Sequence, residues 1–518
     1  MKSKFQNQYN YLIFGLILFI FCISFFQMNS QHWSSHFDSD WFNIYNILLI
    51  KSGIVQDFYD HPAFTLFFIN SIFLQVYELF DNSISYNIQQ IQNAGNLDEY
   101  FKKIFIIGRL VNAIFHCGTI YLLHLILIKF NINKVINILF IFSFVFSNFF
   151  LINLFQIRPE IISVFFVLLS FYQIIRFNEN KNFYLIFLSG LLMGLAFISK
   201  IQIFFFIFFI ALILPMMKYF QNENFNINEK NNKFQFKFLF LLYSIISLAY
   251  ILLEIIVIYN HERYVDHPKI DLYGFIFFNF LYVFYLKFFL NNSSNELKLN
   301  ICYYIIFFLG FVSTTIFLIF IDIIKLAPVN HNIYFKLLNP YYFLSNRTLD
   351  GDFLNLLINF FKFEVILNNK YLLISLILFF SYLNKINKIN KIQSFSLLIS
   401  FGLLLVTIFS NNLRYFQIYE IYTFIAFLFF FIFFNKESFF KIKFLSILIL
   451  LILTVHNTFY INNFNKYFNR ISYFENCNTS NWILLKNKNG LKEWLPWTKK
   501  FDENFYKRIC SDVLKKSI

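Results

Sequence analysis

Two observations predict an all-α, polytopic membrane protein. First, 58% of the 518 residues are hydrophobic and only 14% are charged. Second, the apolar residues gather into repeated runs of about 20, which is the length that an α-helix needs to cross a bilayer. Because lipid cannot satisfy backbone polar groups, segments of this kind are expected to be helices. We therefore expect about 13 transmembrane helices in one chain.

The first apolar run follows the segment MKSKFQNQYN and lacks a small-residue cleavage site. It predicts a retained span that is entered from the cytoplasm, rather than a removed signal peptide. A large first external loop, about residues 28–103, should follow it. The apolar segment 63–79 inside this loop is short and carries polar residues. We expect it to be a helix that lies in the membrane interface or dips into it. The predicted spans are 11–26, 104–128, 135–155, 161–175, 183–199, 201–217, 238–258, 273–290, 301–321, 371–383, 395–410, 416–434 and 444–460.

Lysine and arginine mark alternate connections between these spans. If the N-terminus is cytoplasmic and segment 63–79 does not cross, every short Lys-rich loop falls on the cytoplasmic side. The net charge of +15 then reflects these loops and does not indicate a nucleic-acid partner. We expect a multi-pass protein of the plasma (inner) membrane whose active face is external or periplasmic. Five of the residues that define the cytoplasmic side are Lys129, Lys134, Arg176, Lys181 and Lys298.

The opposite, external side collects the ionisable residues that are not in Lys-rich loops. Such groups near membrane depth are costly and usually mark a functional site. The candidate site residues, which include one tyrosine, are Asp38, Asp40, Tyr45, Asp60, His61, Arg109, Arg158, Glu160, Lys200 and Arg414. The polar chemistry of the protein is therefore expected to face outward.

Several of these residues stand in segments that resemble the polyprenyl-phosphate-sugar-dependent glycosyltransferases of the GT-C superfamily. The stretch DSDWFNIYNILLIKSGIVQDFYDHP resembles the first external loop of the group that includes the protein O-mannosyltransferases and the lipid A aminoarabinose transferase, family 39-like. GRLVNAIFHCGTIYLL is similar to its Arg-led second span, SGLLMGLAFISK to its Gly-rich segment, and LRYFQIYEIYTFIAFLFF to its late Arg-Tyr span. The resemblance implies a GT-C-like fold and an enzyme that takes a hexose or pentose from a lipid-linked donor.

The chain also departs from the family pattern in three places. It has DSD where Asp-Glu is common, Ala63 after His61-Pro62 where Pro or Gly is common, and Glu160 where the second carboxylate is often Asp. These differences leave the subfamily of donor and acceptor open. A glycan, a lipid or a protein of the cell envelope remain alternative acceptors.

The expected reaction needs a carboxylate that removes the acceptor's proton as it attacks the anomeric carbon, with inversion. Asp40 is the candidate base, and Asp38 is the alternative. Asp38, Asp40 and Glu160 could instead hold a divalent cation, Mg²⁺ or Mn²⁺, through hard oxygen ligands.

The leaving group is a lipid phosphate, whose developing charge requires cations in a partly desolvated pocket. Arginine suits bidentate phosphate contacts. The candidates for this role are Arg414, Lys200, Arg158 and His61. Arg109, Tyr45 and Asp60 are further site candidates from the family segments.

Each candidate also has a structural interpretation. Asp38 and Asp40 could cap an interfacial helix, and His61-Pro62 could simply start one. Arg158 and Glu160 could be a structural ion pair, Lys200 could extend to the headgroups, and Arg414 could bind lipid phosphate without a catalytic role. A transporter or flippase of lipid-linked glycans, a polysaccharide polymerase or ligase, and a non-catalytic scaffold are the alternative functions.

The chain divides into a membrane-embedded glycosyltransferase domain, residues 1–460, and a small external tail, residues 461–518. A second long external loop, residues 322–352, should lie on the active face and could order over the pocket. Cys477 and Cys510 in the tail could form a disulfide in an oxidising compartment.

Overall fold

The computed structural model describes residues 2–30, 40, 42–56, 63–81, 86–154, 156–216, 238–249, 252, 279–289, 294–329, 333, 424–425 and 428. All regular secondary structure in these ranges is helical, which confirms the predicted all-α fold. The predictions for Asp38, Asp60, His61, Arg414, most of the 322–352 loop and the tail with Cys477 and Cys510 lie outside the described residues.

Four described helices are long and apolar enough to cross a membrane. They are α1 (Lys2–Ser30), α5 (Leu97–Lys129), α8 (Pro159–Asn180) and α14 (Ser294–Ile323). All four extend the predicted runs at both ends, because the flanking polar residues continue the helix beyond the apolar stretch.

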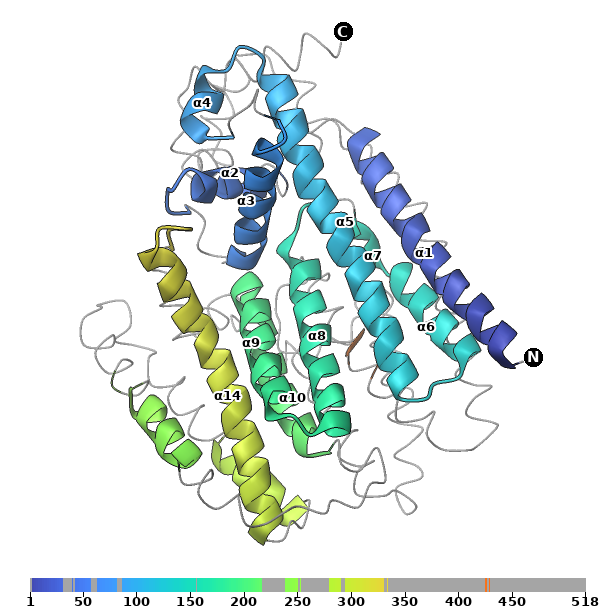
Figure 1. Ribbon diagram of the computed structural model, residues 1–518, viewed down its shortest axis with the longest axis vertical. Helices are drawn as coiled ribbons and strands as arrows, with labels where there is room; N and C mark the ends of the chain where they lie inside the picture. The colour runs from blue at the N-terminus through green and yellow to red at the C-terminus, as the bar shows by residue number, and fades with distance from the viewer. Residues whose placement is uncertain are drawn as a thin grey trace, which may run out of the picture.

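The long helices pack side by side with α9 (Phe183–Ser199) (Figure 1). Helix α9 lies between α8 and α14, and α5 packs between α8 and α1. Helix α10 (Phe204–Ile213) follows α9 after the short 3-10 turn η3 (Ile201–Ile203), and it ends in a second such turn, η4 (Leu214–Met216). Where the sequence predicts one span, 201–217, the structure therefore has a shorter helix with a turn at each end.

The predicted span 135–155 is also divided. Helix α6 (Lys134–Val145) ends before Phe146, and the short helix α7 (Asn148–Leu154) begins after Ser147. The Ser147 hydroxyl accepts a hydrogen bond from the backbone N–H of Phe150 at 3.2 Å, so it satisfies a donor at the start of the new helix. Periodic hydropathy carries no signal of such a break, because both halves are apolar.

The segment between α1 and α5, predicted to be external, folds over one end of the long helices. Its helices are α2 (Phe42–Lys51), α3 (Phe64–Glu78) and α4 (Ile88–Asn93) (Figure 1). Lys51 pairs with Glu78 at 2.6 Å, and Lys103 of α5 pairs with Asp81 at 2.9 Å, so charges join the ends of α2, α3 and α5. With 15 residues, α3 is too short to span a bilayer upright, and its interfacial position stays a prediction.

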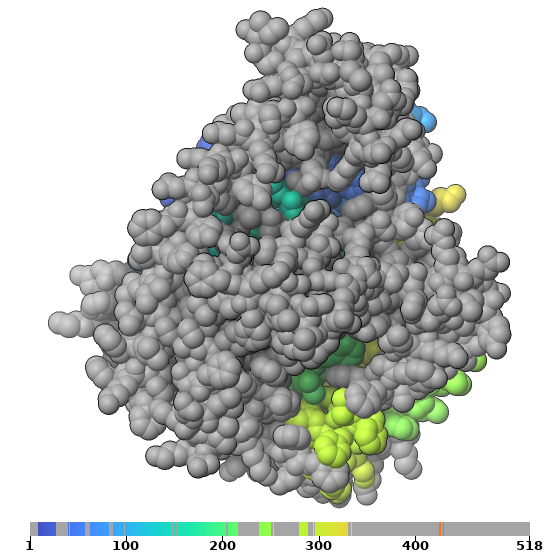
Figure 2. Space-filling model, turned by 180° about the vertical axis from the view of Figure 1, so that it is seen from behind, coloured from blue at the N-terminus to red at the C-terminus, as the bar shows by residue number. Residues whose placement is uncertain are grey.

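The opposite end of the bundle holds the N-terminus, the turn between α5 and α6, the turn between α8 and α9, and the start of α14 (Figure 1). Lys129 of α5 pairs there with Glu179 of α8 at 2.8 Å. The predicted Lys-rich connections among the described residues thus share one end, and the candidate site residues share the other. Seen from behind, yellow-green atoms of η7 (Tyr285–Phe289) and α14 are exposed at this Lys-rich end (Figure 2).

Glycines allow α9 and α14 to approach closely. A Cβ on Gly190 or on Gly310 would overlap a backbone carbonyl oxygen of the other helix, that of Phe307 or Phe187. Thr314 also donates a hydrogen bond from its hydroxyl to the Leu191 carbonyl at 3.2 Å. Small residues of this kind let transmembrane backbones meet, since packing rather than hydrophobicity drives helix association in lipid.

We expect Gly190→Ala to lower the free energy of unfolding by about 1–3 kcal/mol, because the contact is with rigid backbone. Gly15→Ala in α1 is the matched control, since nothing lies within 4 Å of its added Cβ. Thermal unfolding of the purified protein in detergent measures both. Equal midpoints for the two variants would contradict the close α9–α14 contact.

Candidate active site

Asp40 is the centre of the described polar residues at the α2–α3 end. Its carboxylate is completely buried. Oδ1 accepts a hydrogen bond from the backbone N–H of Ile157 at 2.8 Å, and Oδ2 lies 4.0 Å from Nη2 of Arg109. A buried carboxylate is stable only with such partners. The structure thus brings together two predicted site residues that are 69 positions apart in the sequence.

Arg109 reaches this carboxylate from α5, and the glycine before it makes the approach possible. A Cβ on Gly108 would lie 2.8 Å from Cδ1 of Ile157 and 3.1 Å from Cδ1 of Ile44. Because Gly108 has no side chain, Ile44 of α2 and Ile157 can pack onto α5. The Arg109 guanidinium also lies over the Phe105 ring, 5.6 Å from its centroid, which adds a cation–π contact.

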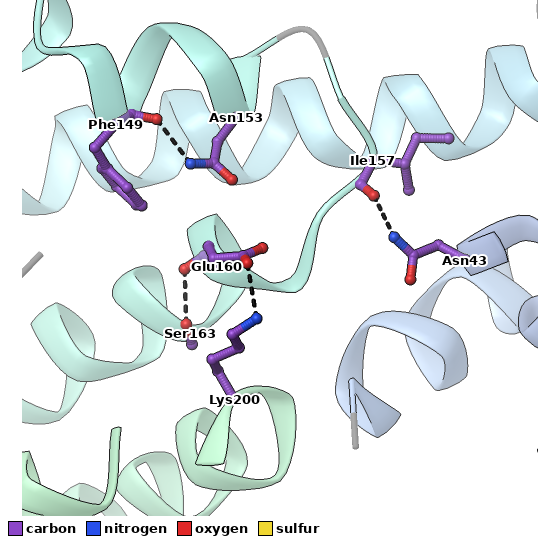
Figure 3. A network of polar contacts seen from close by, with 7 residues as sticks. All are labelled: Asn43, Phe149, Asn153, Ile157, Glu160, Ser163 and Lys200. Atoms are coloured by element: carbon purple, nitrogen blue, oxygen red, sulfur yellow. Dashed lines mark hydrogen bonds and ion pairs between the residues drawn. The ribbon is translucent and has the colours of Figure 1, made fainter. Parts of the chain in front are cut away.

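A second buried charge pair lies at the same end. Nζ of Lys200 donates to Oε1 of Glu160 at 2.8 Å, and both side chains are about 95% buried (Figure 3). Glu160 is in the first turn of α8, where the helix dipole favours a negative charge. Lys200 is the C-cap residue of α9. Glu160 therefore has a charged partner, Lys200, that the sequence places 40 positions away, and an Arg158–Glu160 ion pair stays an alternative interpretation.

Two further candidates have different surroundings. Arg158 is the N-cap residue of α8, with an extended backbone and a partly buried side chain, next to the Glu160–Lys200 pair. Tyr45 is 1% exposed and is part of the hydrophobic core through α2. Its burial favours a packing role over direct contact with a substrate.

The connection between α7 and α8 is held by side chains from three helices. Asn112 of α5 donates to the Asn153 carbonyl at 2.8 Å, and Ser24 of α1 donates to the Leu154 carbonyl at 3.2 Å. Asn43 of α2 donates to the Ile157 carbonyl at 2.6 Å (Figure 3). The last carbonyls of a helix and the non-helical backbone after it need such partners when they are buried in a membrane protein.

Sequence reasoning missed Asn43, Asn112 and Ser24. The available signal was an amide or hydroxyl side chain inside an apolar run, which is unusual enough to suggest a polar partner. The partner itself is a backbone carbonyl far away in the sequence, and no side-chain pattern encodes it. Seen from behind, blue atoms of the α2–α3 part and teal atoms of the α6–α8 part are exposed next to each other, in agreement with these contacts (Figure 2).

The predicted divalent cation has two of its three proposed ligands in the described part of the chain. Asp40 and Glu160 each face a basic side chain there, Arg109 and Lys200. Within the described residues, no three His, Cys, Asp or Glu side chains form a group that could hold a metal ion. The cation stays a prediction that depends on Asp38.

Residues 55–262 match the family model of the dolichyl-phosphate-mannose-protein mannosyltransferases. The match confirms the GT-C resemblance that the sequence motifs indicate. It covers Arg109, Arg158, Glu160 and Lys200, and it begins after Asp40. With the long apolar helices, it indicates an integral membrane glycosyltransferase that uses a polyprenyl-phosphate-linked sugar. No curated protein is significantly similar to the chain.

We expect Lys200→Met to lower the free energy of unfolding by about 3–5 kcal/mol, because Glu160 would remain as an unpaired buried charge. The double variant Glu160→Gln/Lys200→Met should recover most of this loss, since it removes both charges. The control Lys129→Met breaks a pair that is about one third exposed, so it should cost about 0–1 kcal/mol. Thermal unfolding of the four proteins measures these effects. A double variant as unstable as Lys200→Met would contradict the pairing.

Proposed function

We propose that the protein transfers mannose from a polyprenyl-phosphate donor to an acceptor hydroxyl of the cell envelope, with inversion at the anomeric carbon. The observation that carries the proposal is the position of Asp40. This carboxylate is fixed by Ile157 and Arg109 at the same end of the bundle as the Glu160–Lys200 pair. The domain that supplies Arg109, Glu160 and Lys200 is the one that matches the mannosyltransferase family.

In this proposal Asp40 is the general base. The acceptor oxygen attacks the anomeric carbon from the face opposite the phosphate and forms the new glycosidic bond. The acceptor's proton moves to Asp40, and the bond from the anomeric carbon to the phosphate oxygen breaks with its electron pair on that oxygen. Because the Asp40 side chain has no exposed surface, the acceptor must displace the groups that cover it. Asp38 is the alternative base.

Positive charge near the start of α8 would stabilise the leaving polyprenyl phosphate. Arg158 and Lys200 carry two positive charges against the single negative charge of Glu160. The N-terminus of the 22-residue helix α8 adds a favourable dipole for an anion. The Arg158 side chain is partly exposed whereas that of Lys200 is 5% exposed, so Arg158 is the better placed of the two for direct contact with phosphate. His61 and Arg414 remain proposed contributors.

The reaction would occur on the external side of the plasma membrane. The Lys-rich connections lie at the opposite end of the bundle, together with the N-terminus (Figure 1). The positive-inside tendency assigns that end to the cytoplasm. The protein, glycan or lipid acceptor would therefore be met outside the cytoplasm.

We expect Asp40→Asn to reduce mannose transfer by about 10²–10⁴-fold at normal protein levels, because an amide cannot take the proton. Membranes that contain each variant are supplied with radiolabelled dolichyl phosphate mannose and native envelope acceptors. Asp38→Asn tests the alternative base. Asp81→Asn is the control, since Asp81 is also an external carboxylate with a cationic partner, Lys103. Undiminished transfer by Asp40→Asn would rule out Asp40 as the base.

A further inference from the structure

We propose that Asn43 is a positioning residue that fixes the orientation of the Asp40 carboxylate and its position relative to the Glu160 carboxylate. The inference rests on the proposed function of Asp40 and assigns a role to a residue outside the family match. Its basis is a two-point contact with one residue. Asn43 donates to the carbonyl of Ile157 at 2.6 Å, while Asp40 accepts from the N–H of the same residue at 2.8 Å.

The two contacts act together because they come from the same short stretch of chain. Asp40 lies two residues before α2, and Asn43 is in the first turn of that helix. The Asp40 bond by itself would fix only one point of this stretch against Ile157. The second bond, three residues later, holds the start of α2 against Ile157. Oδ1 of Asp40 is thus kept on the Ile157 N–H, and Oδ2 is kept toward Arg109.

Ile157 also determines where the second carboxylate lies. Arg158 caps α8 immediately after it, and Glu160 is in the first turn of this helix. Since only Arg158 and Pro159 separate Ile157 from Glu160, the Asn43 contact ties the two carboxylates to one short piece of backbone. A sugar transferase needs its base aligned with the anomeric carbon, and a shift of about 1 Å can cost about 10²-fold in rate.

Asn112 offers a matched comparison. It is also a buried asparagine that donates to a backbone carbonyl near the start of α8, at 2.8 Å. Its acceptor is Asn153, four residues before Ile157, and within the described part of the chain its side chain is not hydrogen-bonded to Asp40 or Glu160. Removing either amide leaves a buried carbonyl without its donor, so the expected stability losses are similar.

The experiment compares Asn43→Ala, Asn43→Asp and Asn112→Ala in the full-length protein. The maximal rate of mannose transfer and the apparent KM for dolichyl phosphate mannose are measured with native envelope acceptors, at a temperature where all variants are folded. We expect the maximal rate to fall about 10–10²-fold for both Asn43 variants, with KM within about threefold of the wild-type value. Asn43→Asp keeps the shape but cannot donate to the Ile157 carbonyl. Asn112→Ala should keep a rate within about threefold of wild type.

A background variant separates this role from a general loss of structure. Because Asn43 acts through Asp40, adding Asn43→Ala to Asp40→Asn should reduce the residual rate by less than about twofold. Wild-type rates for both Asn43 variants, or equal losses for Asn43→Ala and Asn112→Ala, would overturn the positioning role while leaving Asp40 as the base. Full transfer by Asp40→Asn alone would overturn the proposed function and the positioning role together.

Discussion

The need to satisfy buried, non-helical backbone governs the arrangement of this protein. Where the chain passes from α7 to α8, its carbonyls cannot bond along a helix and water is scarce. Side chains from α1, α5 and α2 supply the missing donors through Ser24, Asn112 and Asn43. Asp40 supplies the acceptor for the Ile157 N–H. The same contacts that stabilise this connection therefore bring the segment between α1 and α5 onto the long helices.

The candidate active site follows from that connection. Ile157 holds Asp40 on one side, and α8 presents Glu160 to Lys200 on the other. Gly108 leaves the space in which α2, α5 and Ile157 meet. Two buried carboxylates, each next to a basic residue, then share one end of the bundle. Charges in this setting keep fixed positions, since moving either partner would expose the other to an apolar environment.

The sequence was sufficient for the fold class, the long helices and the end of the bundle at which the described site residues lie. Apolar length and the distribution of lysines carry that information. The sequence was not sufficient for the break after α6, where both halves are equally apolar, or for the Glu160–Lys200 pair. It also did not identify the partner of Asn43, because that partner is a main-chain carbonyl. Such contacts depend on the tertiary arrangement, and no local pattern specifies them.

The most direct test of the account is an experimentally determined structure of the protein with dolichyl phosphate mannose bound. We predict that the mannose lies beside Asp40 and that its phosphate lies near Arg158 at the start of α8, with Asn43 still bonded to Ile157. A donor headgroup bound at the opposite, Lys-rich end of the helices, near Lys129 and Lys181, would contradict the account.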